Sequence, residues 1–251
     1  MKVRGELALG GDERSSRRGS NQVFSRKRTI EAPDIDLPPE IRPNTCLRMD
    51  GQEFLAKLPA DAIPVAFFDP QYRGVLDKLA YGNEGQSRER RRSALEQMSE
   101  RVIELFISGI DRVLMPSGHL FLWVDKFHLC QGVSGWFEGT SLEIVDMLTW
   151  DKGTFGMGYR TRRRAEYCVI VQKRPKRAKG VWKVHNIPDV VKESASQKRH
   201  PHSKPVELQG ALLCAVSSPG DFVIDPAAGS FSVLEAAMKH DRAFLGCDLN
   251  G

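Results

Sequence analysis

The chain has 251 residues, 41% of them hydrophobic and 27% charged, which is the composition of an ordinary globular protein. No apolar run approaches the roughly 18 residues that a membrane-spanning helix needs, and residues 1–20 lack the apolar core of a signal peptide. The five cysteines include no closely spaced pair, which argues against a disulfide framework or a zinc site. We therefore expect a cytoplasmic protein without a bound metal.

The chain has a net charge of +5, and its basic residues are concentrated in two segments. Residues 1–30 contain eight Lys or Arg against three Asp or Glu, with Gly and Ser between them and no helical or strand period. We expect residues 1–35 to form a disordered basic arm. Residues 160–183 contain ten Lys or Arg and one acid, Glu166. A charged segment is often only a solvated surface, but two of them beside a structured core favour a polyanionic partner.

Strands and helices alternate along most of the chain. Up to residue 124 the pattern predicts strand 44–50, helix 51–59, strand 63–68, helix 93–114 with a capping box at Ser93, a turn at 115–118 and strand 119–124. Beyond that it predicts strands 142–150 and 165–173, helix 204–217, strand 221–226, helix 232–240 and strand 242–248. Such alternation indicates an α/β fold with a mostly parallel sheet and helices on both faces.

Two strand ends carry residues suited to binding a ligand, and ligands of open α/β sheets bind beyond the carboxyl ends of strands. After strand 221–226 comes a turn of small residues that includes Gly229 and Ser230, and the following strand ends at Asp248. A turn of small residues lets a ligand approach backbone N–H groups, and the acid can accept hydrogen bonds from ribose hydroxyls, as in sites for NAD, FAD and S-adenosylmethionine. A tight turn with a structural Asp is the alternative interpretation.

The second strand end reads "FFDPQYRG" and places Asp69, Pro70 and Tyr72 in one turn after an apolar strand. Asp and Pro are common turn formers, so a plain turn is the simplest interpretation. However, "DPQY" resembles "DPPY", the catalytic motif of enzymes that methylate the exocyclic amines of bases. Similarly "HPHSKPVEL" resembles "HPTQKP", "DPAAGSFSV" resembles "DPFxGSGTT", and residues 149–173 resemble the strand pair that carries a basic loop toward DNA.

The order of these motifs, catalytic first and cofactor-binding last, is that of the beta class of S-adenosylmethionine-dependent DNA amino-methyltransferases (adenine-N6 or cytosine-N4). The resemblance covers residues 44–251 and implies a Rossmann-like methyltransferase fold with permuted motif order. It divides the domain into a catalytic half (44–172), a short candidate recognition segment (173–199) and a cofactor-binding half (200–251). It also implies double-stranded DNA as a partner, with no role for a membrane, and members of the family often form homodimers.

The resemblance assigns roles to individual residues. The Asp69 carboxylate and the Pro70 carbonyl would accept the two N–H bonds of a flipped-out base, which would stack on Tyr72. S-adenosylmethionine would be contacted by Asp50, His200, Ser203, Lys204, Asp225, Ala227, Gly229, Ser230, Phe231 and Asp248. The DNA would be contacted by Arg160, Arg162, Arg163 and Arg164.

The chain departs from the family pattern at two places. Gln71 replaces the second Pro of the catalytic motif, and in the cofactor motif Ala227 replaces an aromatic residue while Phe231 replaces a Gly. Because one side chain is smaller and the other larger than usual, the two replacements would together preserve the volume of the cofactor pocket. Alternatively, they would weaken cofactor binding. Because Asp at position 69 accompanies adenine more often than cytosine in this family, the expected reaction is methylation of adenine N6. Methylation of cytosine N4, an RNA base methyltransferase and a catalytically weakened DNA-binding homologue are the alternatives.

Overall fold

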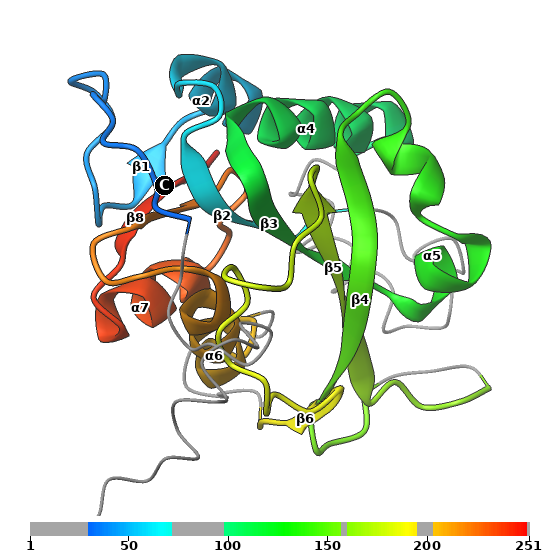
Figure 1. The fold of residues 1–251 in the computed structure, drawn as a ribbon. Helices are drawn as coiled ribbons and strands as arrows, with labels where there is room; N and C mark the ends of the chain where they lie inside the picture. The colour runs from blue at the N-terminus through cyan, green and yellow to red at the C-terminus, as the bar shows by residue number, and fades with distance from the viewer. Residues whose placement is uncertain (1–29, 72–97, 157–159, 195–202, 250–251) are drawn as a thin grey trace, which may run out of the picture.

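The computed structural model of the protein describes residues 30–71, 98–156, 160–194 and 203–249. Through this part of the chain runs an eight-stranded sheet with the strand order β1-β8-β7-β2-β3-β5-β4-β6 (Figure 1). The strands are β1 (Leu47–Arg48), β2 (Ile63–Phe68), β3 (Leu114–Val124), β4 (Leu142–Asp151), β5 (Ala165–Lys173), β6 (Val190–Lys192), β7 (Phe222–Asp225) and β8 (Ala243–Asp248).

The sheet is mostly parallel, as the sequence predicts. β1, β8, β7, β2 and β3 run parallel to one another, and only β5 is antiparallel to its two neighbours, β3 and β4. All six residues of β2 are buried, because helices cover both faces of the sheet at this point. The carboxyl ends of the parallel strands therefore lie at one edge of the sheet, and the amino-terminal end of β5 joins them there.

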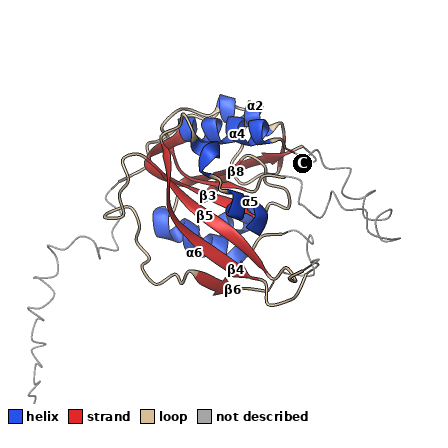
Figure 2. Cartoon of the chain, turned by 90° about the vertical axis from the view of Figure 1, so that its right-hand side faces the viewer, coloured by secondary structure: helices blue, strands red, loops and turns tan. Residues whose placement is uncertain are grey.

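Helices pack on both faces of the sheet, which makes three layers (Figures 1 and 2). α2 (Gly51–Lys57) and α4 (Glu100–Val113) cover one face, and α6 (Val206–Val216) and α7 (Ser232–Lys239) cover the other. Between β3 and β4 lie the short helix α5 (Lys126–Gln131) and the 3₁₀ helix η3 (Ser134–Phe137). α4 buries Ile103, Phe106, Ile107 and Ile110, which share one face at helical spacing. None of the helices in the described ranges is long and apolar enough to cross a membrane.

Two predicted boundaries in the first half of the chain are wrong. The helix expected from residue 93 begins at Glu100, where the Ser99 hydroxyl accepts the Val102 N–H at 3.3 Å and so caps it; residues 93–97 lie outside the described ranges. The turn expected at 115–118 lies inside β3, because Leu114 already pairs with Ile63 of β2. Ser117, with φ of 65°, marks an irregularity within that strand.

Two further segments contribute to the packed structure. Ile35 and Leu37 pack against the core beneath α2 and α4, so the chain is packed at the predicted end of the basic arm. In the candidate recognition segment, Trp182 and Ile187 pack against the core beneath α6, and β6 pairs with β4. The described residues of this segment therefore extend the sheet and the layer that contains α6.

Gly246 permits the close approach of β7 and β8. A Cβ atom at this position would lie 2.6 Å from the Asp225 carbonyl oxygen and would also overlap the Phe244 ring. The added Cβ would be closer to the carbonyl oxygen and to the ring than van der Waals contact allows. The carbonyl cannot easily move, because it belongs to the backbone of the paired strand. The position therefore requires glycine.

We expect Gly246→Ala to lower the free energy of unfolding by about 1–3 kcal/mol, the usual cost of overpacking a core. Chemical denaturation measured by circular dichroism would test this. Gly135→Ala is the matched control, since a Cβ there meets no atom within 4 Å, and it should change stability by less than about 0.5 kcal/mol. Equal stability of the two variants would contradict the assignment.

Candidate active site

Aspartates gather at the carboxyl edge of the sheet. Every strand that ends at this edge, apart from the peripheral β6, has an Asp as its last residue or within the next two positions: Asp50 after β1, Asp69 after β2, Asp125 after β3, Asp151 in β4, Asp225 in β7 and Asp248 in β8. Parallel strands bring these side chains to one edge although they are far apart in the sequence. The hydrogen-bond and ion-pair partners of these aspartates show which ones cap helices or hold the backbone and which ones contact other side chains.

Asp50 and Asp125 begin helices. One oxygen of Asp50 accepts the N–H groups of Gln52 and Glu53 at 2.9 and 3.1 Å, which caps α2. Asp125 caps α5 in the same way. In this structure Asp50, predicted to contact the cofactor, caps the start of α2.

Asp69 is placed differently, because its partner is a side chain from another element. The ammonium of Lys204 lies 2.7 Å from Oδ2 of Asp69 and 3.0 Å from Oε2 of Glu166, at the start of β5. The other oxygen of Glu166 accepts a hydrogen bond from Lys152, which follows β4. Two carboxylates and two ammonium groups therefore alternate along one line, in the order Asp69, Lys204, Glu166, Lys152, which we call the ion chain.

Burial and neighbouring charges set the protonation of the ion chain. Burial raises the pKa of Asp69, the nearby Lys204 opposes this, and the negative charge of Glu166 adds to it. Since 37% of the Asp69 side chain remains accessible, solvent limits the effect. Burial also acts to raise the pKa of Glu166, but Lys204 and Lys152 outweigh it and lower that pKa to about 2. Glu166 is therefore anionic at neutral pH.

Asp225 ends β7 next to β2 and is 5% exposed. One of its oxygens accepts the Ala227 N–H at 3.2 Å, which fixes the start of the small-residue turn. Burial, with the negative charges of Asp69 and Asp248, raises the pKa of Asp225 to about 8. A cationic group placed beside Asp225 would favour the ionised form.

The turn after β7 is open on the side of Gly229. Gly229 has φ of 50°, and a Cβ added there would meet no atom within 4 Å. Phe231 also adopts the left-handed conformation, with φ of 55°, which explains why a glycine is common at its position in the family pattern. The Phe231 ring packs edge-on against Phe244, in the core beneath α6 and α7, whereas Ala227 packs on the opposite core. The two residues pack against different cores, and the predicted exchange of bulk stays a prediction.

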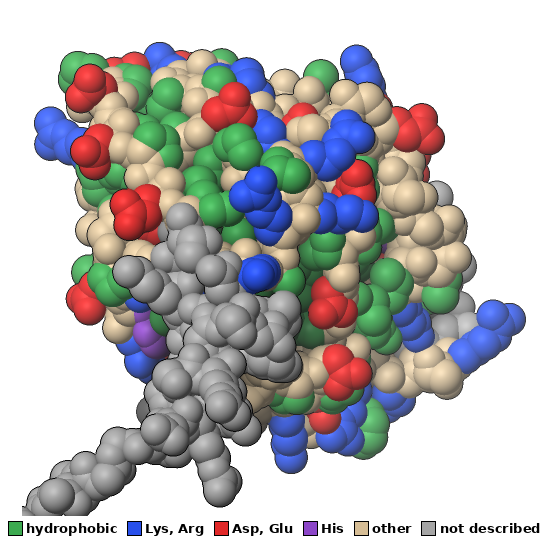
Figure 3. Space-filling model, viewed as in Figure 1, with side chains coloured by type: hydrophobic (Ala, Val, Ile, Leu, Met, Phe, Trp, Pro, Cys, Tyr) green, Lys and Arg blue, Asp and Glu red, His purple; other side chains and the backbone are tan. Residues whose placement is uncertain are grey.

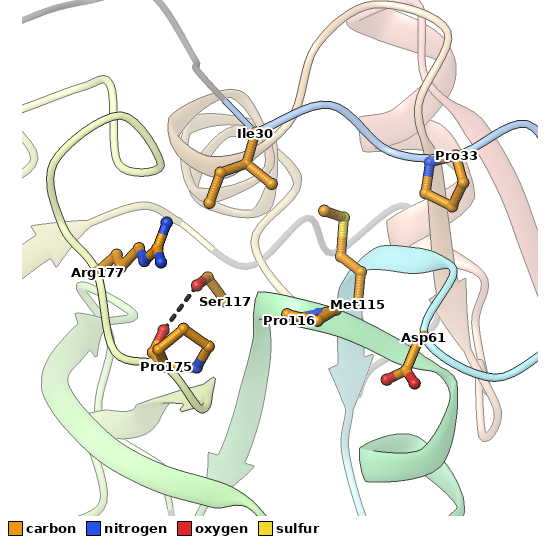
Figure 4. Close-up of a pocket in the computed structure, with 8 residues that line it drawn as sticks. All are labelled: Ile30, Pro33, Asp61, Met115, Pro116, Ser117, Pro175 and Arg177. Atoms are coloured by element: carbon orange, nitrogen blue, oxygen red, sulfur yellow. Dashed lines mark hydrogen bonds between the residues drawn. The ribbon is translucent and has the colours of Figure 1, made fainter.

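Of two cavities that the described residues form, one is close to these side chains. A cavity of about 240 Å³ is lined by residues that precede α6 or begin α7, including Ser203, Lys204 and Ser230. A larger cavity of about 370 Å³ is bounded by Ile30, the irregular start of β3 and Arg177, where the Ser117 hydroxyl donates to the Pro175 carbonyl at 2.6 Å (Figure 4). It lies at the opposite edge of the sheet from the aspartates, so its greater size does not make it the active site.

The predicted DNA-contacting arginines lie in or beside the connection between β4 and β5, around which Lys and Arg side chains gather in Figure 3. Arg160 and Arg162 are exposed. Arg164 instead binds both oxygens of Asp151, at 2.6 and 2.7 Å, and these hydrogen bonds lower the pKa of Asp151 to about 2. The Arg163 guanidinium lies 5.7 Å from the centre of the Phe127 ring. Arg163 and Arg164 therefore brace the connection. Arg162 is exposed although its Nε donates to the Gly156 carbonyl at 2.8 Å, and Arg160 is exposed as well.

The structure thus brings together most of the predicted site residues that it describes. Tyr72 and His200 lie outside the described ranges, so their predicted roles stay predictions. Sequence reasoning missed Glu166 and Lys152 as members of the site. The available signal was Glu166 itself, the one acid within a segment of ten basic residues. Among the described residues no group of three or more His, Cys, Asp or Glu side chains is arranged to hold a metal.

The fold and these strand ends define an α/β enzyme that binds a nucleoside-containing cofactor beside an acidic reaction site. Comparison with known proteins gives the family. A family model described as DNA methylase, of the N6/N4 type, matches residues 63–251. The chain is 55% identical over 203 residues to the Type II methyltransferase M.HhaII of Haemophilus parahaemolyticus, covering 80% of this chain and 89% of that protein. The protein belongs to the S-adenosylmethionine-dependent N6/N4 DNA methyltransferase family.

Other relatives are more distant. The DNA adenine methyltransferase YhdJ of Escherichia coli K12 is 42% identical over 53 residues, which is 21% of this chain and 18% of that protein. The PvuII DNA methyltransferase (cytosine-N4-specific) superposes with a TM-score of 0.62 at 14% identity, covering 90% of this chain and 84% of that one. The M1.HpyAVI–SAM complex gives 0.53 at 18% identity, covering 80% and 90%. These structures confirm the predicted Rossmann-like fold.

The residues present fit S-adenosylmethionine. The Asp248 carboxylate ends β8 beside the open turn at Gly229, where it can accept hydrogen bonds from ribose hydroxyls. Gly51 lets α2 pack directly against the same turn, since a Cβ there would overlap the Pro226 carbonyl oxygen. Asp225 and the cavity at Ser203 and Ser230 would offer polar groups to the amino acid end.

We expect Asp248→Ala to weaken S-adenosylmethionine binding by about tenfold or more, because hydrogen bonds to a charged group contribute about 1.5–3 kcal/mol. Isothermal titration calorimetry on the folded variant would measure this. Glu138→Ala, a loss of one acid at the end of η3, is the control and should bind the cofactor as the wild type does. Unchanged cofactor affinity of the Asp248 variant would show that another residue binds the ribose.

Proposed function

We propose that this protein is a site-specific DNA methyltransferase that transfers the methyl group of S-adenosylmethionine to the N6 amino group of adenine. The observation that carries the proposal is the position of Asp69. It follows β2 at the carboxyl edge, next to β7 and the turn assigned to the cofactor. A base amino group at Asp69 would therefore lie beside the cofactor that supplies the electrophilic methyl group.

Asp69 has one oxygen suited to the base. Lys204 contacts Oδ2, and Oδ1 has no hydrogen bond from the described residues. In the proposed reaction Oδ1 accepts one N–H of the amino group and the Pro70 carbonyl accepts the other. This holds the nitrogen lone pair toward the methyl group, and proximity supplies much of the rate gain. After transfer, Oδ1 is the nearest acceptor for the proton that the methylated amine must lose.

Gln71 does not leave the catalytic turn unsupported. Its carbonyl accepts the Met98 N–H at 2.7 Å, which ties the turn to the residues just before α4. Pro70 is buried behind Asp69. These contacts support an active enzyme over a homologue whose catalytic turn has loosened.

Adenine is favoured over cytosine by the identity of residue 69. An Asp at this position accompanies adenine more often in this family, and YhdJ, which is similar over a short stretch, is a DNA adenine methyltransferase. The likeness to the cytosine-N4-specific PvuII enzyme concerns the fold alone. Cytosine N4 is the second candidate, because its amino group requires the same two acceptors.

Digestion of methylated duplex DNA to nucleosides, followed by mass spectrometry, would identify the modified base. We expect N6-methyladenine in DNA incubated with the protein and S-adenosylmethionine. N4-methylcytosine would exclude the adenine assignment but keep the enzyme class. Methylation of RNA and not of DNA would exclude the proposed substrate.

Asp69→Ala should reduce the rate of methyl transfer by far more than tenfold, where tenfold corresponds to about 1.4 kcal/mol of activation barrier. The variant should still bind the cofactor. The carboxylate acts on the base, so the loss should appear in single-turnover rate and not in S-adenosylmethionine affinity. Asp146→Ala, at an exposed position in β4, is the control and should keep wild-type turnover. An Asp69 variant with more than roughly a tenth of wild-type turnover would contradict the role.

The exposed arginines are the best candidates for binding phosphates. Arg160→Ala with Arg162→Ala should weaken DNA binding, and the slope of log K against log salt should flatten by about 0.9 for each phosphate that the protein no longer neutralises. Arg174→Ala with Lys176→Ala removes the same charge at the opposite edge of the sheet, where 59% and 51% of these side chains are exposed. Fluorescence anisotropy across a salt series would compare the pairs. Equal slopes in the two double variants would place the DNA elsewhere.

A further inference from the structure

Glu166 lies in the ion chain but has no place in the proposed reaction. It comes from β5, which is separated from β2 by β3, so it reaches Asp69 only through Lys204. The Lys204 ammonium is 2.7 Å from Asp69 and 3.0 Å from Glu166, and Lys152 binds the far oxygen of Glu166. Two acids and two bases thus balance each other's charge.

The surroundings of Lys204 show why a second acid is needed. Only 13% of its side chain is exposed, and the ammonium lies 5.5 Å from the centre of the Trp123 ring. A buried ammonium is stable only when enough acceptors surround it. If Asp69 were its only partner, Lys204 would bind the Asp69 carboxylate more strongly than it does when shared with Glu166. Asp69 would then be a weaker hydrogen-bond acceptor for the base.

We propose that Glu166 is a positioning residue for methyl transfer: it shares the Lys204 ammonium with Asp69 and so leaves Asp69 oriented, yet available, for the amino group of the target base. Lys152 supports this role by holding Glu166 from the other side. The inference rests on the proposed function, because it assigns Asp69 to the base.

The charged and titratable groups that face Asp69 set the direction of the expected pH effects. They are Lys204 before α6, Glu166 and Cys168 on β5, Lys152 after β4, and Asp225 on β7. The positive groups lower the pKa of Asp69, and Glu166 raises it. Since the ionised carboxylate is the active form, the acid limb of the rate profile follows this pKa.

Glu166→Gln removes one negative charge while keeping the shape of the side chain. We expect the single-turnover rate to fall roughly tenfold, since small misplacements of reacting groups have effects of this size or larger. The pKa of Asp69 falls when the carboxylate of Glu166 is removed, so the acid limb should move to lower pH. Cofactor affinity should stay within about twofold, a change of less than about 0.5 kcal/mol.

Lys204→Met should move the acid limb in the opposite direction, to higher pH, because it removes the positive charge beside Asp69. Opposite shifts from neighbouring residues are the signature of shared charge, and a purely structural role for Glu166 would not produce them. Glu143→Gln is the matched control: Glu143 also pairs with two basic residues, Arg174 and Lys176, but at the far end of the β4–β5 pair. It should leave both rate and acid limb unchanged.

An acid limb that stays in place in Glu166→Gln, or that moves in the same direction in both variants, would overturn the proposal. If Glu166→Gln does not fold, Lys152→Met tests the same chain: it removes a positive charge that lowers the pKa of Asp69, so the limb should move to higher pH. A wild-type protein that methylates no DNA would refute the proposed function. An active wild type whose variants keep the wild-type profile would refute only the inference.

Discussion

The ammonium of Lys204, held between Asp69 and Glu166, is the contact on which the candidate active site depends. It joins three parts of the chain that the sequence separates: the end of β2, the start of β5 and the residues before α6. Because a buried charge must be matched by opposite charge, none of the three side chains can be placed without the others. The turn after β2 is thereby fixed to the residues that precede α6.

The parallel sheet supplies the other constraint, since it delivers an aspartate from each of several strands to one edge. A cluster of carboxylates is costly unless each has a partner, and the chain solves this in different ways. Asp50 and Asp125 cap helices, Asp151 binds Arg164, and Asp69 binds Lys204. Asp225 is buried with its pKa raised to about 8, chiefly because burial disfavours its charge. The same residue type thus provides structure at some strand ends and chemistry at others.

The connection between β4 and β5 shows a similar division among residues of one type. Arg160 and Arg162 are exposed, whereas Arg164 is bound to Asp151 and Arg163 lies against Phe127. A run of basic residues in the sequence is therefore not a uniform DNA-binding surface. Some of its members bind side chains or the backbone of the connection, and some are exposed on its surface.

Much of this protein is determined by local pattern. Alternating strands and helices predicted the α/β fold, the continuous apolar run predicted β2, and the short motifs after Phe68 and at Asp225 indicated where strands end. These features are readable because they depend on neighbouring residues: side-chain periodicity, turn chemistry and short motifs. The start of α4 was misplaced because serines suited to capping occur at both 93 and 99, and a contact of Met98 with Gln71 selects the later one.

Only the tertiary structure decided what the charged residues do. Lys204 contacts both Asp69 and Glu166, and Arg164 binds Asp151. These pairs form because strand order and burial determine which charged side chains lie next to each other. Likewise Ala227 and Phe231, four residues apart, pack on opposite sides of the sheet. A sequence specifies which groups are present, whereas the distances between them, and hence their charge and reactivity, arise only when the strands are aligned.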